Sequence, residues 1–179
     1  MAGIIKVNQY QDFNGNTLFT SDGNGNLTTM KTNYPAFEAY LSSDQGVSDN
    51  TVTKAQIDTE LFDTDNCYDN STNYRFTPTT AGKYFVYCTL EMDGGTGTNL
   101  NGAYAFIYKN GSNYMRNLTD FYNNQVRAQS ITVSAIIDMN GSSDYIELYG
   151  AVDDSSGSSQ GYFVGGEHKC LFGGYKIIE

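Results

Sequence analysis

The chain has 179 residues, a formal net charge of −10 and only ten Lys and Arg residues. No basic cluster that could neutralise phosphates is present, which argues against nucleic-acid binding, and no apolar run reaches the roughly 18 residues that would suggest membrane insertion. Fifteen Tyr and ten Phe are too many for a disordered chain. Combined with abundant Thr, Asn and Gly, these aromatic residues indicate an all-β protein.

Residues 1–33 predict three short strands, in the sequences IIKV, DFNGNTLFT and SDGNGNLTTM, with Asn-Gly and Asp-Gly turns between them. A free-standing meander this small is marginal in water. We therefore expect a β-arm that needs another surface, either a partner protein or the arms of sister copies; the alternative is that it packs on the main domain. Its apolar residues are few: Ile4, Ile5, Val7, Phe13, Leu18, Phe19 and Leu27.

Residues 34–179 are typical of a single domain. A first strand is expected at AFEAYLSS and two or three more between residues 54 and 92, where Cys88 is expected to be a small core residue. No stretch has helical periodicity, so we predict no helix, and many short strands with regular turns indicate a β-sandwich or barrel. The clearest strands are GAYAFIYKN, AQSITVSAIIDM, DYIELYGAV and CLFGGYKIIE.

The connections between these strands are of two kinds. The Asn-Gly pairs at 110–111 and 140–141 predict tight hairpin turns with positive φ at both positions. Long polar connections cover residues 93–101, 119–127 and 153–169. Because antiparallel neighbours reverse direction, every second connection falls at the same end of a sandwich. We expect the tight turns and the C-terminus at one end and the long loops at the other.

Long loops on a rigid sandwich are where binding residues usually lie. Tyr with Asn, Ser and Gly combines rigid aromatic area with adaptable hydrogen bonding, which would suit a glycan or a host-surface protein. The alternative is that the loops are polar covers over the end of the sandwich. The candidate ligand-binding residues are Tyr122, Asn123, Asn124, Tyr162 and Phe163.

The stretch from Ile57 to Val86 resembles the signature of the C1q/TNF-like globular head. The family pattern F-x5-G-x-Y-x-F is matched by Phe76, Gly82 and Tyr84, with Val86 in place of the second Phe. Upstream, Asp63 and Tyr68 match if one residue is inserted, Ile57 stands in place of a Phe, and LFGGYKI resembles the closing strand of the family. The resemblance covers most of the chain and implies a ten-stranded jelly roll that assembles as a tight homotrimer.

A sandwich needs only one buried face per sheet, whereas the Tyr-rich strands here offer apolar side chains on both faces. Tyr84, Phe106, Tyr145 and Tyr149 are therefore candidates for the trimer interface. The alternative is that they fill the core of the monomer.

Few residues suggest catalysis or metal binding. His168 is the single histidine, which excludes most catalytic triads and every site with two His ligands. Asp153 with Asp154, or Glu91 with Asp93, could form a carboxylate pair for glycoside hydrolysis, but such pairs arise by chance in a chain with twenty acidic residues. The resemblance makes a Ca²⁺ site conceivable, yet the acidic spacing is not that of an EF-hand loop. We predict no enzyme activity, no metal and no cofactor.

The arm suggests a setting for the head. GNTLFTSDGNGNLT resembles the short β-repeats at the start of some bacteriophage virion proteins, and the N-terminus lacks the basic and apolar regions of a signal peptide. We expect a virion structural protein, such as a capsid fibre, capsid decoration or tail fibre, made in the host cytoplasm. Its arm would dock on other virion proteins and its head would serve host attachment. The alternative is a soluble C1q-like ligand-binding module of a cellular organism.

Overall fold

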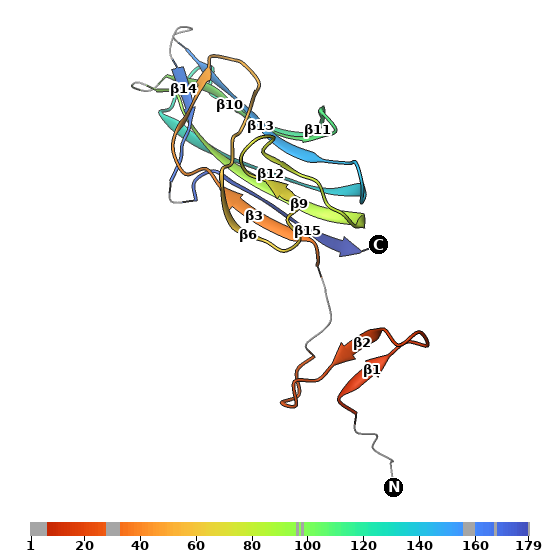
Figure 1. The fold of residues 1–179 in the computed structure, drawn as a ribbon. Coiled ribbons are helices and arrows are strands. Elements are labelled where there is room, and N and C mark those ends of the chain that lie inside the picture. Colours follow the sequence, from red (N-terminus) through yellow and green to blue (C-terminus); the bar gives the residue numbers. More distant parts are fainter. Residues whose placement is uncertain are drawn as a thin grey trace. The chain divides into compact units, whose positions relative to one another are not determined.

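The computed structural model describes residues 7–27, 33–95, 97, 99–155, 160–166 and 168–178. The expected strand IIKV lies mostly outside these residues. The chain divides into two compact units, Met1–Thr32 and Asn33–Glu179, which we describe separately as the arm and the head. Every regular element in the described residues is a strand, so the all-β prediction is confirmed (Figure 1).

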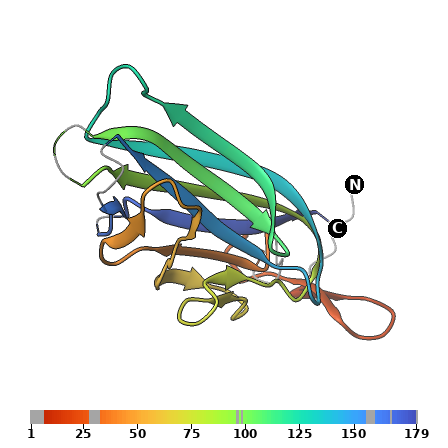
Figure 2. The ribbon, with the colours of Figure 1, turned by 90° about the horizontal axis from the view of Figure 1, so that it is seen from above.

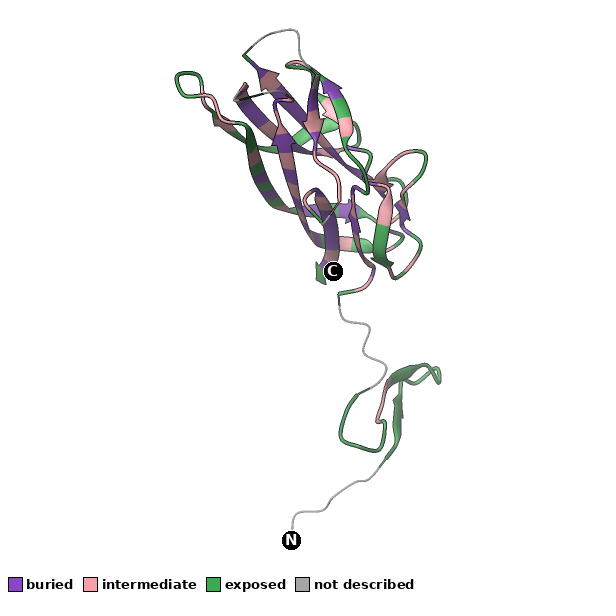
Figure 3. Cartoon of the chain, turned by 90° about the vertical axis from the view of Figure 1, so that its left-hand side faces the viewer, coloured by how far each residue is buried: buried purple, intermediate pink, exposed green. Residues whose placement is uncertain are grey.

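The described part of the arm is an antiparallel pair, β1 (Gln9–Gln11) and β2 (Thr17–Thr20). Two matching turns follow these strands: Asp12 accepts the backbone N–H groups of residues 14 and 16, and Asp22 those of residues 24 and 26. No described residue of the arm is buried (Figure 3). Phe13 is 104% exposed. The described arm therefore has no core of its own.

The head is a sandwich of two antiparallel sheets, which appear as layers in Figure 2. The ten-strand count is not confirmed, because the described head contains thirteen strands, several of only two residues. They are β3 (Ala36–Tyr40), β4 (Gln45–Ser48), β5 (Thr53–Lys54), β6 (Thr59–Asp63), β7 (Tyr68–Asp69), β8 (Arg75–Phe76), β9 (Ala81–Asp93), β10 (Leu100–Lys109), β11 (Ser112–Asp120), β12 (Ala128–Asn140), β13 (Ile146–Asp154), β14 (Gln160–Phe163) and β15 (Leu171–Ile178).

Strand β9 is the centre of the first sheet. It pairs with β12 along one side, and β15 and β14 lie end to end along its other side. Beyond them, β3 and β6 follow β15, and β4 follows β14. The second sheet has the order β11-β10-β13-β8-β7, with β5 also paired to β13. Strands β11 and β12 are thus the end strands of the two sheets.

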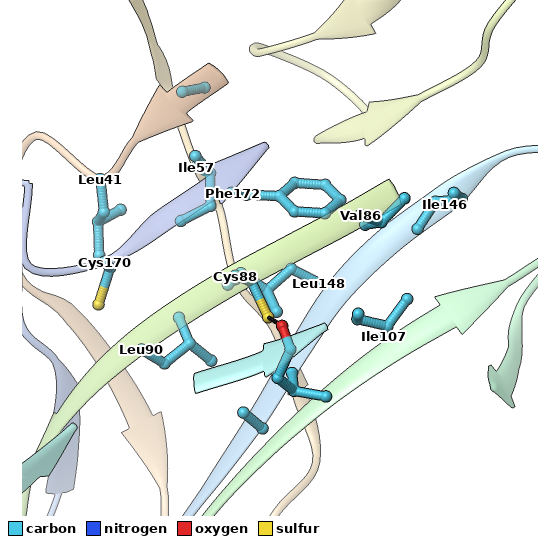
Figure 4. Close-up of a cluster of buried hydrophobic side chains, with 14 of the residues drawn as sticks. Leu41, Ile57, Val86, Cys88, Leu90, Ile107, Ile146, Leu148, Cys170 and Phe172 are labelled. Carbon is cyan, nitrogen blue, oxygen red and sulfur yellow. Dashed lines mark hydrogen bonds between the residues drawn. The ribbon is translucent and has the colours of Figure 1, made fainter. Parts of the chain in front are cut away.

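The core between the sheets is built by alternation along the long strands. On β9 the buried side chains are Tyr84, Val86, Cys88, Leu90 and Met92. They pack in one cluster with buried residues of β10, β13 and β15 (Figure 4). The thiol of Cys88 lies 3.6 Å from the carbonyl oxygen of Val133, and burial raises its pKa. The prediction that Cys88 is a small core residue is confirmed.

The tight turns meet at one end of the sandwich. The side chain of Asn110 bonds Asp144 at 2.8 Å and accepts the backbone N–H of Tyr145 at 2.9 Å. At this same end Ile178 pairs with Lys83, near the start of β9, so β15 also finishes there. At the opposite end, Gly94 bonds Arg127 and Ser155 bonds Asn99 through their backbones. The expected sorting of connections is therefore confirmed in the described residues.

One of the two hairpin turns differs from its prediction. Asn110 and Gly111 both have positive φ, as the favoured two-residue turn requires. At the second turn only Gly141 does. Instead, the side-chain oxygen of Asn140 accepts hydrogen bonds from the backbone N–H groups of residues 142, 143 and 144. This capping holds a longer connection between Asn140 and Ile146, so the two-residue turn predicted here is wrong.

Candidate recognition surface at the loop end

The loop after β11 forms a hollow of about 500 Å³ that is lined by residues 120 to 124. Three sequence candidates, Tyr122, Asn123 and Asn124, lie together here beside Asp120 and Phe121. The Tyr122 side chain is 70% exposed. An exposed aromatic ring flanked by two amides provides one apolar surface and several hydrogen-bonding groups for a ligand.

Backbone and side-chain hydrogen bonds fix this loop. The N–H of Phe121 bonds the carbonyl oxygen of Asn101 at 2.7 Å, and Asp120 accepts the N–H of Tyr122 at 2.9 Å. Gln125 donates to the carbonyl oxygen of Tyr122 at 3.0 Å. The loop end therefore presents Tyr122 from a hydrogen-bonded turn, which lowers the ordering cost of binding.

Tyr162 lines a second hollow, of about 210 Å³, at the same end of the head. Strand β14 places Tyr162 opposite Asp93, the last residue of β9. The Arg127 Nε lies 3.3 Å from Asp93 Oδ2, and the side chain of Arg127 is 77% exposed. Sequence reasoning missed Arg127 and considered Asp93 only as a carboxylate partner of Glu91. The signal in the sequence was a single Arg at the end of a long polar connection in an acidic chain. The remaining lining residues are Asp44, Gly95 and Val164.

Phe163, the fifth candidate, is not part of the surface. It is fully buried in the core, and its ring lies against Gly150 of β13. The segment expected to be one long loop contains β14, which pairs with both β4 and β9 and turns Phe163 inward. The prediction that Phe163 binds ligand is therefore wrong.

The four candidates for the trimer interface separate into two groups. Tyr84 is fully buried between the sheets, where its hydroxyl donates to the carbonyl oxygen of Thr80 at 2.7 Å, so its assignment to a surface is wrong. Phe106 and Tyr149 pair with each other on the outer face of the second sheet. Tyr145 immediately precedes β13, with the Arg75 guanidinium 4.6 Å from its ring centroid. A role for Phe106, Tyr145 and Tyr149 in a trimer stays a prediction.

The acidic segment 63–69 uses its carboxylates within the chain. Asp63 accepts the backbone N–H of Tyr68 at 2.7 Å. Asp69 accepts backbone N–H groups of residues 71 to 73, and these bonds, above all that from Thr72, lower its pKa. Within the described ranges, no group of three or more His, Cys, Asp and Glu residues is placed to hold a metal ion.

The other chemical candidates, His168, Asp153 and Asp154, are not among the lining residues of either hollow. His168 has a positive φ of 58° and meets the Tyr40 ring edge-on at 4.6 Å. Asp154 is buried, whereas Asp153 is partly exposed and accepts a bond from Asn101 at 3.2 Å. Burial raises the pKa of Asp153. In the part of the chain that the structure covers, no helix has the length and apolar character to span a membrane.

Solved structures show which fold this is. The globular domain of zebrafish complement 1qA protein superposes with a TM-score of 0.58 at 14% identity, over 81% of this chain and 98% of that domain. The head has a C1q/TNF-like jelly-roll fold. Eiger TNF from S. frugiperda gives 0.56 at 10% identity over 80% of this chain and 92% of that one. Murine APRIL at pH 5.0 gives 0.54 at 11% identity, over 79% and 99%.

At these identities the likeness establishes the fold and not the activity. No protein-family model matches the sequence, and no curated protein matches it. The C1q/TNF-like head that the Phe76, Gly82 and Tyr84 pattern indicated is therefore confirmed as a fold.

Proposed function

We propose that the chain is a non-enzymatic virion protein of a bacteriophage that assembles as a homotrimer. Its arm docks on the particle, and the loop end of its head binds a host-surface glycan or protein. The observation that carries the proposal is a pair of unlike apolar surfaces on the head, one on the outer face of the first sheet and one at its edge.

The first surface consists of Phe85, Tyr87 and Tyr175, which point away from the core on β9 and β15. Phe85 lies 5.9 Å from Tyr87 and 5.6 Å from Tyr175 between ring centroids. All three are only partly buried in the single chain. Tyr87 donates its hydroxyl hydrogen bond to Glu38, which satisfies the polar group nearest the rings. Clustered aromatic rings with satisfied polar groups are typical of the centre of a protein interface.

The second surface consists of Tyr114, Met115 and Ile136 at the edge of the sandwich. Ile136 is 58% exposed and lies opposite Phe85 in the register of β12 and β9, so the two surfaces adjoin. The Tyr114 hydroxyl bonds the carbonyl oxygen of Ile136 at 3.2 Å, and Asn117 Nδ2 bonds that of Thr132 at 2.9 Å. These bonds from β11 use carbonyl groups of the end strand β12. An edge that packs on the unlike face of the next copy generates a closed ring when the rotation allows it.

We place the interface on the face of β9 and β15 rather than on the face with Phe106 and Tyr149. The face with Phe106 and Tyr149 also carries Arg116, which makes no ion pair or hydrogen bond with any described residue. Burying an unpaired guanidinium in an interface would be strongly unfavourable.

The arm supports attachment to a larger assembly. Its exposed apolar residues include Phe13, Leu18 and Leu27, and a two-stranded hairpin is at best marginally stable alone. Docking on a particle, or on the arms of sister copies, would cover these residues. Electron microscopy of purified particles tests this location: density for trimeric heads supports it, and absence of the chain from particles would favour the soluble binding module instead.

The assembly itself is tested by Ile136→Asp in the full chain. A carboxylate at the edge should convert trimers to monomers in sedimentation velocity, while circular dichroism shows an unchanged β-sheet spectrum. Val52→Asp is the matched control, because Val52 is a similarly exposed β-branched residue outside both surfaces. Equal sedimentation of Ile136→Asp and wild-type protein would contradict the proposed interface.

A further inference from the structure

A row of four side chains, one from each of four strands, crosses the outer face of the second sheet, with a cation at each end and two aromatic rings between them. The row runs from Arg116 on β11 to Phe106 on β10, Tyr149 on β13 and Lys54 on β5, as the strand registers show. The Nζ atom of Lys54 lies 5.7 Å from the Tyr149 ring centroid. Two aromatic residues are thus flanked by a cation on each side.

Two further rings extend this row along β10. Tyr108 lies against Tyr149 with ring centroids 4.2 Å apart, and it meets Phe106 edge-on at 6.2 Å. Tyr104 follows two residues before Phe106, and its ring lies over Gly102, where a Cβ would come within 2.9 Å. These rings lie outside the core between the sheets. Tyr104, Tyr108 and Tyr149 are partly exposed.

The part of this face around Tyr108 and Tyr149 is locally basic in a chain of net charge −10, whereas Asp120 and Asp153 flank Gly102 and make the Tyr104 end acidic. Lys54 is paired with Glu147 at 2.5 Å, and Glu147 is buried. Asp69 pairs with Arg75 in the strand register, but its carboxylate oxygens are already used by the turn that follows it. The Arg75 guanidinium stacks over Tyr145, and Arg116 is exposed. Around Tyr108 and Tyr149, three cations therefore face two carboxylates, and neither arginine has a carboxylate partner in the described residues.

We propose that this face binds an acidic polysaccharide. The C–H faces of its pyranose rings would pack on Tyr108 and Tyr149, and its carboxylates would pair with Arg116 and Arg75. Charge complementarity selects this occupant, since aromatic rings alone would accept a neutral sugar equally well. With strands spaced by about 4.8 Å, the row from Arg116 to Lys54 spans roughly 14 Å, so the ligand must contain more than one sugar unit.

This site goes beyond the proposed function and is independent of it. It shares no residue with the loop-end hollows or with the two surfaces assigned to the trimer. Loss of the trimer would leave the site intact on the monomer, and loss of polysaccharide binding would leave the trimer intact.

The test is isothermal titration of the full chain with polygalacturonate. Fully methyl-esterified polygalacturonate retains the rings but not the charges, and polyglutamate retains the charges but not the rings. We expect binding of polygalacturonate and at least roughly fivefold weaker binding of both other polymers, the size of one surface charge contact. Absence of polygalacturonate binding, or equal binding of polyglutamate, would overturn the proposal.

Two variants assign the binding to this face. Arg116→Gln should weaken polygalacturonate binding by roughly threefold to fivefold, whereas Lys83→Gln, which removes an exposed cation on the first sheet, should leave it unchanged. Tyr108→Ser should also weaken polygalacturonate binding, because it removes one of the rings on which the sugar would pack. Equal losses in the Arg116 and Lys83 variants would overturn the assignment, because they would indicate unspecific charge attraction. Dissociation of the trimer by Arg116→Gln would also overturn it, because the face would then be covered by a sister copy.

Discussion

The Phe163 ring occupies the space that Gly150 leaves by having no side chain: a Cβ on Gly150 would lie 2.8 Å from two ring carbons. The same Cβ would also meet Leu90 at 2.8 Å. Strand β14 depends on this fit, because Phe163 is the side chain that attaches it to the core.

Gly150→Ala should therefore destabilise the head by overpacking. We expect a loss of about 1–3 kcal/mol in the free energy of unfolding, measured by urea denaturation. The additional strain should also expose Tyr162, the neighbour of Phe163 on β14, to faster hydrogen exchange at its backbone. An unchanged urea midpoint would show that the Phe163 ring can move aside without cost.

The Lys54–Glu147 pair should contribute to stability because one partner is nearly inaccessible to water. Burial alone lowers the pKa of Lys54, but the hydrogen bond and charge of Glu147 raise it overall. Glu147→Ala should cost about 1–3 kcal/mol, because it removes the partner of a partly buried ammonium group. Adding Lys54→Met should recover part of this loss. Additive effects of the two substitutions in a double-mutant cycle would contradict a direct coupling.

Acid should weaken the turn held by Asp69. Its pKa is lowered in the folded chain by backbone hydrogen bonds, first that from Thr72. A lowered folded pKa means that the carboxylate stabilises the fold above the unfolded pKa of about 3.9, and that this stabilisation is lost as pH falls through the folded value. Asp69→Asn should therefore lower the urea midpoint more at pH 7 than at pH 3. An equal difference at both pH values would contradict the assignment.

Tyr122 should matter for binding and little for folding. Its side chain is largely exposed at the loop end, so Tyr122→Ala should change the free energy of unfolding by less than about 0.5 kcal/mol. Adsorption of the purified protein to host cells, measured by flow cytometry, should fall. Phe13→Ala removes an even more exposed ring, from the arm, and serves as the control. Unaltered adsorption of the Tyr122 variant would exclude this ring from recognition.

Sequence patterns were sufficient for the class of fold and for the arrangement of its connections. Alternation along residues 102–110 predicted β10, and the Asn-Gly pair at 110–111 predicted its turn. Reversal of antiparallel strands then sorted the loops, which brought Tyr122, Asn123 and Asn124 to one hollow. These features depend on local residues and on chain direction, both of which the sequence contains.

The orientation of individual side chains was not predictable in the same way. Tyr84 and Phe85 are adjacent aromatic residues, and either could face the core until the partner sheet is placed; Tyr84 does. Strand β14 is only four residues long and follows a polar, Gly- and Ser-rich stretch, so no periodicity revealed it. Its position depends on Gly161 lying against the Val152 side chain, a contact between distant residues.

The central claim is that the head hides the rings of Phe85, Tyr87 and Tyr175 against sister copies. Sedimentation equilibrium of the full chain at micromolar concentration measures this most directly. We predict a single species of three chains that persists across a tenfold dilution. A monomer at these concentrations, with its arm intact, would contradict the claim.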